Sequence, residues 1–376
     1  MLLEMLRMTV LASGSKGNST VLTSTATGTS VLVDCGLSCR ETMKRMRFAG
    51  EDPAKLSAII ITHEHQDHVN GVGVLARKLN IPVYFTGATH EAWKRWVTPK
   101  PKRMSREQWF AEQRARNAEV AARSSTSGSA ARSVASAFAP AWQHAAPASA
   151  QIASVQASAQ AAAAAAVAAE QQPNPAAAAE SLTDAEAAAL PSELLPLFEP
   201  EEQDAPDPTA LPAVEYFESG KPFAIEQVGV MPFTVPHDAA DPVGFVFTVE
   251  GVRVAMVTDL GYMPTSVKVN LRGCDVVYIE SNHDLEMLRN GPYPWSVKQR
   301  VLSRVGHLSN DALAEFFNAE YDGAAQWIVL AHLSEANNDP EIARACAERA
   351  LGTRSNLIAN RVVMARQNEP LAAIVL

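Results

Sequence analysis

The sequence predicts an α/β fold in which the ends of strands carry side chains that can bind metal ions. Three observations lead to this prediction. Short apolar runs rich in valine and isoleucine alternate with amphipathic stretches, as strands alternate with helices. Four of these runs end in a histidine or an aspartate, at His63, His237, Asp259 and His332, and His283 is a fifth case. A long segment of different composition separates the first of these residues from the others.

The chain begins with apolar runs that predict three strands, at 10–12, 20–22 and 31–34. A stretch rich in Ser and Gly, residues 13–19, lies between the first two. Its free backbone N–H groups could hold an anion, and a plain hairpin turn is the alternative. Residues 38–49 then predict an amphipathic helix with a basic face.

The stretch that organises the chain is residues 59–68, in which three isoleucines precede three histidines and an aspartate. His63 and His65 are two residues apart, so their rings can point to the same side of an extended loop. Imidazole and carboxylate are ligands that zinc, manganese and iron prefer. Four such side chains in one turn cannot all reach one ion with good angles, so we expect two adjacent ions held by His63, His65, Asp67, His68 and later residues.

A different interpretation of this turn is that Asp67 only caps a helix and the histidines are ordinary surface residues. The chain has nine histidines in 376 residues, and this scarcity disfavours a chance cluster of three. After the turn we expect one helix over 67–79, a strand at 81–85 and a helix over 89–97.

The composition changes from about residue 99 to residue 213, where Ala, Ser, Gln, Pro and Glu dominate. No apolar stripe accompanies the alanines, so we expect a mostly disordered or loosely helical insertion in a surface loop. The domain organisation that we expect is therefore a first half at 1–98, the insertion at 99–213 and a second half at 214–376. A partner-binding arm and a passive spacer are both open as roles for the insertion.

The second half resumes the pattern of strands. Glu250-Gly251 between two apolar runs predicts a hairpin, and helices are expected at 311–321 and from 340. Because His237, Asp259 and His332 each follow an apolar run, we expect them at one rim of the sheet. The expected strands are 223–225, 228–233, 243–249, 252–257, 274–279, 326–330, 362–364 and 372–375, with the last two finishing the sheet.

Cysteine content and hydropathy indicate the cellular compartment in which the protein works. The four cysteines are too few for a disulfide framework in a chain of this length, so we expect free thiols in a reducing cytoplasm. No apolar run approaches the roughly 20 residues of a membrane span, and the first residues lack the features of a signal peptide. The formal charge is −9, but residues 100–220 hold 15 acidic against 8 basic residues, so most of this charge lies outside the expected rim.

The motif Thr62-His63-Glu64-His65-Gln66-Asp67-His68 resembles the signature of the metallo-β-lactamase fold hydrolases. His237, Asp259 and His332 match the remaining motifs of that superfamily in order. More narrowly, the chain is similar to the YycJ (WalJ/VicX-like) branch, which is related to tRNase Z and RNase J. The blocks that carry this likeness include residues 11–18, 33–36, 258–261 and 280–284, and above all Gly306-His307-Leu308-Ser309-Asn310.

The resemblance implies a four-layer αβ/βα sandwich with two divalent ions, Zn or Mn, at the rim of the sheets. It implies that one ion is held by His63, His65 and His237. It implies that the other is held by Asp67, His68 and His332, with Asp259 bridging the two. It also implies nuclease activity, as an exonuclease on DNA rather than RNA. The insertion at 99–213 is not part of the family pattern.

The chemistry expected of such a site is attack of a metal-bridging hydroxide on a phosphodiester. We expect Asp67 to orient the hydroxide and His307 to supply a proton or a positive charge to the leaving oxygen. The alternative for His307 is that it is only a neighbour of a helix N-cap. The candidate substrate contacts are Ser15, Asn18, Asn282, His283 and Lys298. For His283 the alternative is to orient a metal ligand, and for Lys298 it is to lie on a solvated helix face.

Two other functions remain open at the level of the sequence. The same metal pair could hydrolyse a small ester or thioester, because one fold serves many substrates. The fold could also be a non-catalytic, metal-binding scaffold that binds a protein partner through residues 99–213. An intact set of seven ligand residues disfavours the scaffold.

Overall fold

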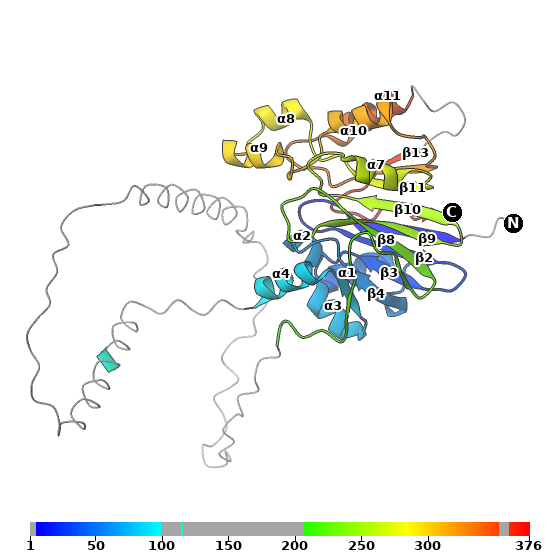
Figure 1. Ribbon diagram of the computed structural model, residues 1–376, viewed down its shortest axis with the longest axis vertical. Helices are drawn as coiled ribbons and strands as arrows, with labels where there is room; N and C mark the ends of the chain where they lie inside the picture. The colour runs from blue at the N-terminus through cyan, green and yellow to red at the C-terminus, as the bar shows by residue number, and fades with distance from the viewer. Residues whose placement is uncertain (1–4, 99–113, 116–206, 353–360) are drawn as a thin grey trace, which may run out of the picture. The chain divides into compact units, whose positions relative to one another are not determined.

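The structure is a computed structural model that describes residues 5–98, 114–115, 207–352 and 361–376. Its strands form two seven-stranded sheets, with helices on the outer face of each (Figure 1). Of the expected insertion, residues 99–113 and 116–206 lie outside the described residues. Within the described residues, no helix is both long enough and apolar enough to cross a membrane.

The first sheet is built mainly from the N-terminal half of the chain, in the order β14-β1-β2-β3-β4-β5-β6. Strands β3, β4, β5 and β6 run parallel to one another, whereas β1 and β2 form an antiparallel ribbon. The strands are β1 (Leu6–Ala12), β2 (Ser19–Ser24), β3 (Ser30–Val33), β4 (Leu56–Ile60), β5 (Val83–Phe85), β6 (Val214–Tyr216) and β14 (Ile374–Val375).

The second sheet has the order β13-β12-β11-β10-β9-β8-β7. Strands β10 to β13 are parallel, and β7 to β10 form an antiparallel meander that includes the expected hairpin at Glu250-Gly251. The strands are β7 (Phe223–Ile225), β8 (Val228–Thr234), β9 (Val243–Val249), β10 (Val252–Val257), β11 (Val276–Glu280), β12 (Trp327–Ala331) and β13 (Arg361–Met364).

Helices cover both sheets. The first sheet carries α1 (Cys39–Phe48), α2 (Gln66–Val69), α3 (Val72–Leu79) and α4 (Gly87–Val97). The second half of the chain supplies α7 (Thr265–Leu271), α8 (Leu285–Asn290), α9 (Trp295–Val301), α10 (Asn310–Ala319) and α11 (Pro340–Leu351).

Three apolar clusters separate these layers. The central one contains residues from both sheets, such as Leu22 and Phe245, and fills the space between them. One outer cluster joins the first sheet to α1, α3 and α4 through residues such as Met46, and the other joins the second sheet to α7, α10 and α11 through residues such as Phe317. Successive residues of a strand point to opposite faces, so the fully buried runs serve two clusters at once. The predicted four-layer αβ/βα sandwich is confirmed.

Two elements differ from the expectation. The single helix predicted over 67–79 is two helices, α2 and α3, that are separated at Asn70 and Gly71. Gly71 lies so close to the loop after β3 that a Cβ there would be 2.2 Å from the Leu37 carbonyl oxygen. The expected last strand over 372–375 is shorter and does not follow β13 in the second sheet. It crosses to the first sheet, where Ile374 lies opposite Met8.

The carboxyl ends of β3, β4, β10, β11 and β12 form one rim, because parallel neighbours end on the same side of a sheet. Three residues that follow these ends have left-handed backbone conformations, namely Asp34, Asp259 and His332, with φ of 57°, 57° and 52°. Such conformations are uncommon for residues other than glycine and cluster at functional sites. The chain is therefore turned sharply where its acidic and histidine side chains leave the sheets.

Candidate metal centre

Seven side chains from four separate segments meet at this rim. They follow β4, β8, β10 and β12, and the structure brings all seven sequence-predicted residues into one cluster. Groups of their nitrogen and oxygen atoms lie close enough together to hold a metal ion. The seven are His63, His65, Asp67, His68, His237, Asp259 and His332.

One side of the cluster is a triad of histidines. The Nδ1 atom of His65 lies 3.2 Å from His63 Nε2 and 3.2 Å from His237 Nε2. His63 and His65 leave the end of β4 in an extended loop, and His65 is the residue before α2. Three imidazole nitrogens that face one another across about 3 Å are the arrangement that a zinc-type ion requires.

The other side combines a carboxylate with two histidines. The Oδ2 atom of Asp67 lies 3.5 Å from His68 Nε2 and 3.4 Å from His332 Nε2. Asp67 and His68 lie in the short helix α2, and His332 follows β12. This set mixes oxygen and nitrogen donors, which suits zinc and manganese alike.

Asp259 lies between the two groups. Its Oδ2 is 3.2 Å from His68 Nε2, and its Oδ1 is 3.9 Å from His237 Nε2. The Oδ2 atom is buried and accepts no hydrogen bond. A buried carboxylate oxygen without a hydrogen-bond donor costs free energy. A cation bound beside it would offset this cost. The residues therefore fit a divalent metal site.

Neighbouring groups fix which nitrogen faces the cluster in three of the histidines. His68 Nδ1 donates to Asp34 Oδ2 over 2.8 Å, and His237 Nδ1 donates to the Gly306 carbonyl oxygen over 3.1 Å. His332 Nδ1 donates to Glu280 Oε1 over 3.0 Å. In these three histidines Nδ1–H donates a hydrogen bond away from the cluster. The Nε2 atom therefore faces the cluster, as in metal-ligating histidines.

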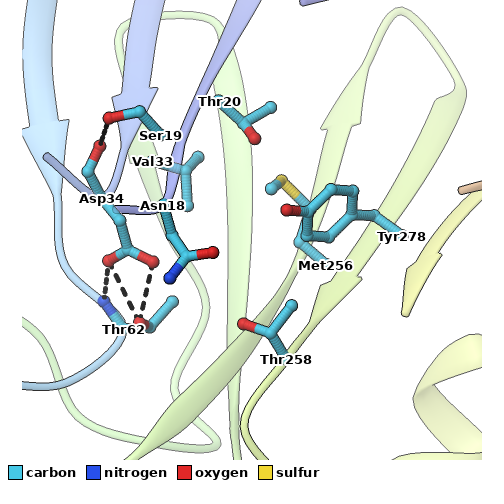
Figure 2. A pocket seen from close by; sticks show the side chains of 9 residues that line it. All are labelled: Asn18, Ser19, Thr20, Val33, Asp34, Thr62, Met256, Thr258 and Tyr278. Atoms are coloured by element: carbon cyan, nitrogen blue, oxygen red, sulfur yellow. Dashed lines mark hydrogen bonds between the residues drawn. The ribbon is translucent and has the colours of Figure 1, made fainter. Parts of the chain in front are cut away.

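Asp34 is itself held by β2 and by the loop after β4. Its carboxylate accepts hydrogen bonds from the Thr62 backbone N–H and from the Thr62 hydroxyl, and Ser19 Oγ donates to its backbone carbonyl (Figure 2). Figure 2 also shows the Tyr278 and Thr258 hydroxyls from the second sheet facing the same space. This cavity has a volume of about 10 Å³, enough for one water molecule.

Negative charge dominates the cluster. Asp34, Asp67, Asp259 and Glu280 meet imidazole, hydroxyl, amide or backbone N–H groups, and among the described residues no Lys or Arg pairs with them. Burial alone lowers the pKa of His68, but Asp259 and Asp34 outweigh it and hold this pKa well above its ordinary value. No lysine or arginine among the described residues balances these carboxylates, and bound divalent cations would do so.

His307 lies beside the cluster and is partly exposed. Its Nδ1 donates to Glu280 Oε1 over 2.7 Å, and its ring lies between those of His237 and His332, with centroids 5.3 Å and 5.2 Å away. Burial alone lowers the pKa of His307, but Glu280 reverses this effect and raises it. The alternative expected for His307 also holds in part, because Ser309 caps α10 two residues later.

The loop before β2 touches the cluster through one of its predicted residues. Asn18 Nδ2 lies 3.1 Å from Asp67 Oδ2 and 3.0 Å from His68 Nε2, so Asn18 orients these two side chains. Ser15 is exposed in the same loop. Asn282 Nδ2 donates to the His332 carbonyl oxygen and thereby fixes the turn that carries His332.

Two predicted residues lie away from the cluster atoms. His283 is 1% exposed, and neither ring nitrogen has a hydrogen-bond partner; burial lowers its pKa to about 4. Lys298 is buried, and its ammonium donates to the carbonyl oxygens of Arg289 and Gly291 at the end of α8. The structure therefore gives Lys298 a structural role between helices instead of the expected phosphate contact or solvated face.

The sequence did not assign roles to Asp34 and Glu280, although both hold metal-facing histidines in place. Glu280 is fully buried, and its Oε2 accepts from the backbone N–H groups of Leu260 and Leu308. Their positions in the sequence could have indicated these roles, because Asp34 follows β3 and Glu280 ends β11, and both strands contribute to the rim.

Two family models match the chain. The model described as the metallo-beta-lactamase superfamily matches residues 13–115, and the one described as a beta-lactamase superfamily domain matches residues 176–332. A crystal structure of the metallo-beta-lactamase fold protein YhfI from Bacillus subtilis shares the fold, with a TM-score of 0.53 at 12% identity over 97% of this chain and 99% of that one. The chain thus has the metallo-β-lactamase fold, and its cluster of side chains fits a divalent metal site.

Within that class the chain is similar to two curated proteins over most of its length. It is 28% identical to "Exodeoxyribonuclease YycJ" of Bacillus anthracis, covering 92% of this chain and 89% of that protein. It is 26% identical to "Exodeoxyribonuclease WalJ" of Streptococcus pneumoniae strain D39, covering 90% of this chain and 85% of that protein. The expected likeness to the YycJ branch is confirmed.

All four cysteines are free, as expected.

Proposed function

We propose that this protein is a dinuclear-metal phosphodiesterase that acts as an exonuclease on DNA. The observation that carries the proposal is the convergence of seven nitrogen- and oxygen-bearing side chains around Asp259. The names of the two curated relatives support DNA as the substrate.

In this proposal His63, His65 and His237 hold one ion, and Asp67, His68 and His332 hold the other. Asp259, which lies between the two groups, would complete both sets of ligands. When bound, such a pair of Zn or Mn ions polarises a phosphoryl oxygen and makes water a stronger nucleophile at neutral pH.

The remaining roles belong to the protein. Asp67, itself oriented by the amide of Asn18, accepts a hydrogen bond from the attacking water and aims it at phosphorus. His307 carries a proton for the leaving oxygen, because its Nδ1 is tied to Glu280 and its ring is partly exposed next to the cluster. A positioned acid of this kind contributes about 10²- to 10⁴-fold to a rate.

The proposal is tested with end-labelled single- and double-stranded DNA and RNA, each incubated with metal-free, Zn-loaded and Mn-loaded protein. We expect mononucleotides from DNA ends with metal-loaded protein and none with metal-free protein. Asp67→Ala should abolish this release, and His307→Gln should reduce kcat about 10²-fold or more while the bound metal stays at two ions per chain.

Three results would contradict the proposal in different ways. Binding of one ion per chain would contradict the dinuclear centre. Cleavage of RNA but not DNA would correct the substrate. Metal-loaded protein that leaves all nucleic-acid ends intact but hydrolyses a thioester would replace the phosphodiesterase with the alternative hydrolase.

A further inference from the structure

Two short helices form a distinct surface beside the metal centre. We call residues 285–306 the helical cap; it consists of α8, α9 and the turn that leads to Gly306. Figure 1 shows α8 and α9 next to each other at one end of the helical layer over the second sheet. Lys298 joins them, because its ammonium binds the carbonyl oxygens that end α8.

The helical cap is bonded directly to the loops of the metal centre. The Gly306 carbonyl oxygen accepts from His237 Nδ1, and the Val305 carbonyl oxygen accepts from the Asp238 N–H over 3.1 Å. The N–H of His307 donates to the Val301 carbonyl oxygen at the end of α9 over 3.0 Å. The cap therefore has a fixed position relative to the proposed reacting atoms.

The loop that carries Asp259 presses against the same segment. A Cβ added to Gly261 would lie 2.3 Å from the carbonyl carbon of Arg304. Only a glycine lets the two backbones come this close. The cap is thus held from both sides, by the loop of His237 and by the loop of Asp259.

The exposed chemistry of the cap is aromatic and basic. The Trp295 side chain is 65% exposed at the start of α9, and the Arg304 guanidinium lies 4.2 Å from the centroid of the Tyr262 ring. The Arg300 side chain is 60% exposed and pairs with Asp238. Residues 285–306 contain four basic residues and one acidic residue in a chain of net charge −9. An exposed tryptophan on a segment that also carries exposed arginines is a combination found in surfaces that bind single-stranded nucleic acid.

We infer that the helical cap binds the single-stranded part of the substrate, with Trp295 stacking on a base and with Arg300 and Arg304 contacting phosphates. This inference rests on the proposed function and adds the surface that holds the strand. Every base has an apolar face, so stacking binds DNA without reading its sequence. Arginine contacts to phosphate fix the path of the backbone.

The length of α9 separates Trp295 from the segment that carries His307. Its seven residues span about 10 Å at 1.5 Å per residue. Val301, at the far end, bonds to the backbone of His307. Trp295 and the segment that carries His307 therefore lie at opposite ends of α9.

The test measures binding of full-length, metal-loaded protein to a fluorescent phosphorothioate oligo(dT), which resists cleavage, and to an abasic oligonucleotide of the same length. Trp295→Ala should weaken binding of oligo(dT) roughly tenfold and leave binding of the abasic strand nearly unchanged. Trp295→Phe should restore most of the affinity. The matched control is Phe48→Ala, an 81% exposed aromatic on α1.

Substitution of an arginine should affect binding of the two strands alike. Arg304→Gln should weaken binding of both strands and reduce the slope of log affinity against log salt by about one. Arg40→Gln, at an exposed position on α1, is its control. Equal affinities of wild type and Trp295→Ala for oligo(dT), or a wild type that does not bind it, would overturn the inference.

Hydrolysis of a small phosphodiester, bis(4-nitrophenyl) phosphate, separates this inference from the proposed function. The wild type should hydrolyse it, and the control Phe48→Ala, on α1, should do so at the same rate. If the wild type hydrolyses it and Trp295→Ala binds DNA normally, the cap inference fails and the phosphodiesterase stands. If no phosphodiester is hydrolysed, the proposed function fails, and the binding measurements still decide whether the cap holds a strand.

Discussion

Glu280 connects two histidines of the metal centre with two of its loops. Its Oε1 accepts from His307 Nδ1 and His332 Nδ1, and its Oε2 accepts from two backbone N–H groups in different loops. Both oxygens are therefore acceptors that face donors only. At this position a carboxylate satisfies every neighbour, and a side chain that carries its own N–H donors cannot.

Glu280→Gln tests this argument with almost no change of shape. The new amide group must place its NH₂ against N–H donors, whichever way it is turned, so His307 and His332 lose their fixed orientation. We expect a fall of about 10- to 100-fold in metal affinity or in kcat/KM on DNA, measured by metal analysis and by nucleotide release. Glu320→Gln is the control, because Glu320 is exposed and pairs only with Lys268. Wild-type values for Glu280→Gln would show that Glu280 does not position these rings.

Gly36 is a second residue on which the site depends. A Cβ at this position would lie 1.6 Å from the Asp67 carbonyl oxygen and 2.7 Å from the Asn18 nitrogen. Gly36→Ala must therefore push apart the two loops that meet at Asp67, and we expect a loss of about 3 kcal/mol or more in the free energy of unfolding. Denaturant unfolding measures this loss.

Gly87→Ala is the matched control for that substitution. Gly87 is the first residue of α4, and a Cβ there would meet no atom within 4 Å. Because alanine favours helix over glycine, we expect unchanged or slightly higher stability, by up to about 1 kcal/mol. If Gly36→Ala were as stable as Gly87→Ala, the close approach at Asp67 would not be a real constraint.

At this scale the sequence predicts ligands better than it predicts the residues that support them. The seven clustered side chains each follow an apolar run, and this pattern is visible without a structure. Asp34 and Glu280 follow such runs too, but their partners are the outer nitrogens of histidines far away in the chain. Lys298 resembles an exposed helical cation because α9 is too short to show an apolar stripe.

Among the elements, strands were predicted more reliably than the places where helices break or sheets exchange strands. At the break between α2 and α3, Gly71 lies close to Leu37, a contact between segments about 34 residues apart in the chain. The last strand was predicted as strand, but its partner was not, because an apolar pair such as Ile374-Val375 fits either sheet. Pairing is decided by the free edge of β1, which only the assembled fold reveals.

Removing residues 371–376 tests the contribution of β14. This segment covers the edge of β1 through backbone hydrogen bonds such as Leu376 N–H to the Leu6 carbonyl, and it places Ile374 in the central cluster. The truncated protein exposes a strand edge and loses buried apolar area. We expect a lower melting temperature and concentration-dependent aggregation, measured by calorimetry and light scattering. Val375→Thr, at a 37% exposed position, should leave both unchanged. Wild-type behaviour of the truncated protein would show that β1 needs no cover.

The molecule as a whole forms its two sheets, its three apolar clusters and its metal centre from residues 5–98, 207–352 and 361–376. These residues belong to one compact unit. The sequence placed the start of the insertion at residue 99 from composition alone. It could not show how residues just before β6 are used, because their composition is still that of the insertion.

Those residues return to the fold before β6 begins. Arg77 Nη1 donates to the Ala210 carbonyl oxygen over 2.8 Å, Leu211 packs against the outer cluster of the first sheet, and the Ala213 carbonyl oxygen accepts from the Val83 N–H. A deletion that ends at 206 keeps these contacts, and one that ends at 213 removes them.

Two deletions therefore separate the fold from the insertion. Replacing 99–206 with a Gly/Ser linker of about 20 residues should leave cooperative unfolding and full metal binding, because every strand, cluster residue and proposed ligand named above lies outside 99–206. Replacing 99–213 should also leave the ligands, but it removes the partly buried Leu211 contact, the backbone hydrogen bond from Val83 and the side-chain hydrogen bond from Arg77. We expect the second protein to be less stable than the first by about 1–3 kcal/mol, measured by denaturant unfolding of the metal-loaded proteins. Loss of cooperative unfolding in the first deletion would show that the sandwich needs residues 99–206. Equal stability of the two would show that residues 207–213 contribute nothing to the first sheet.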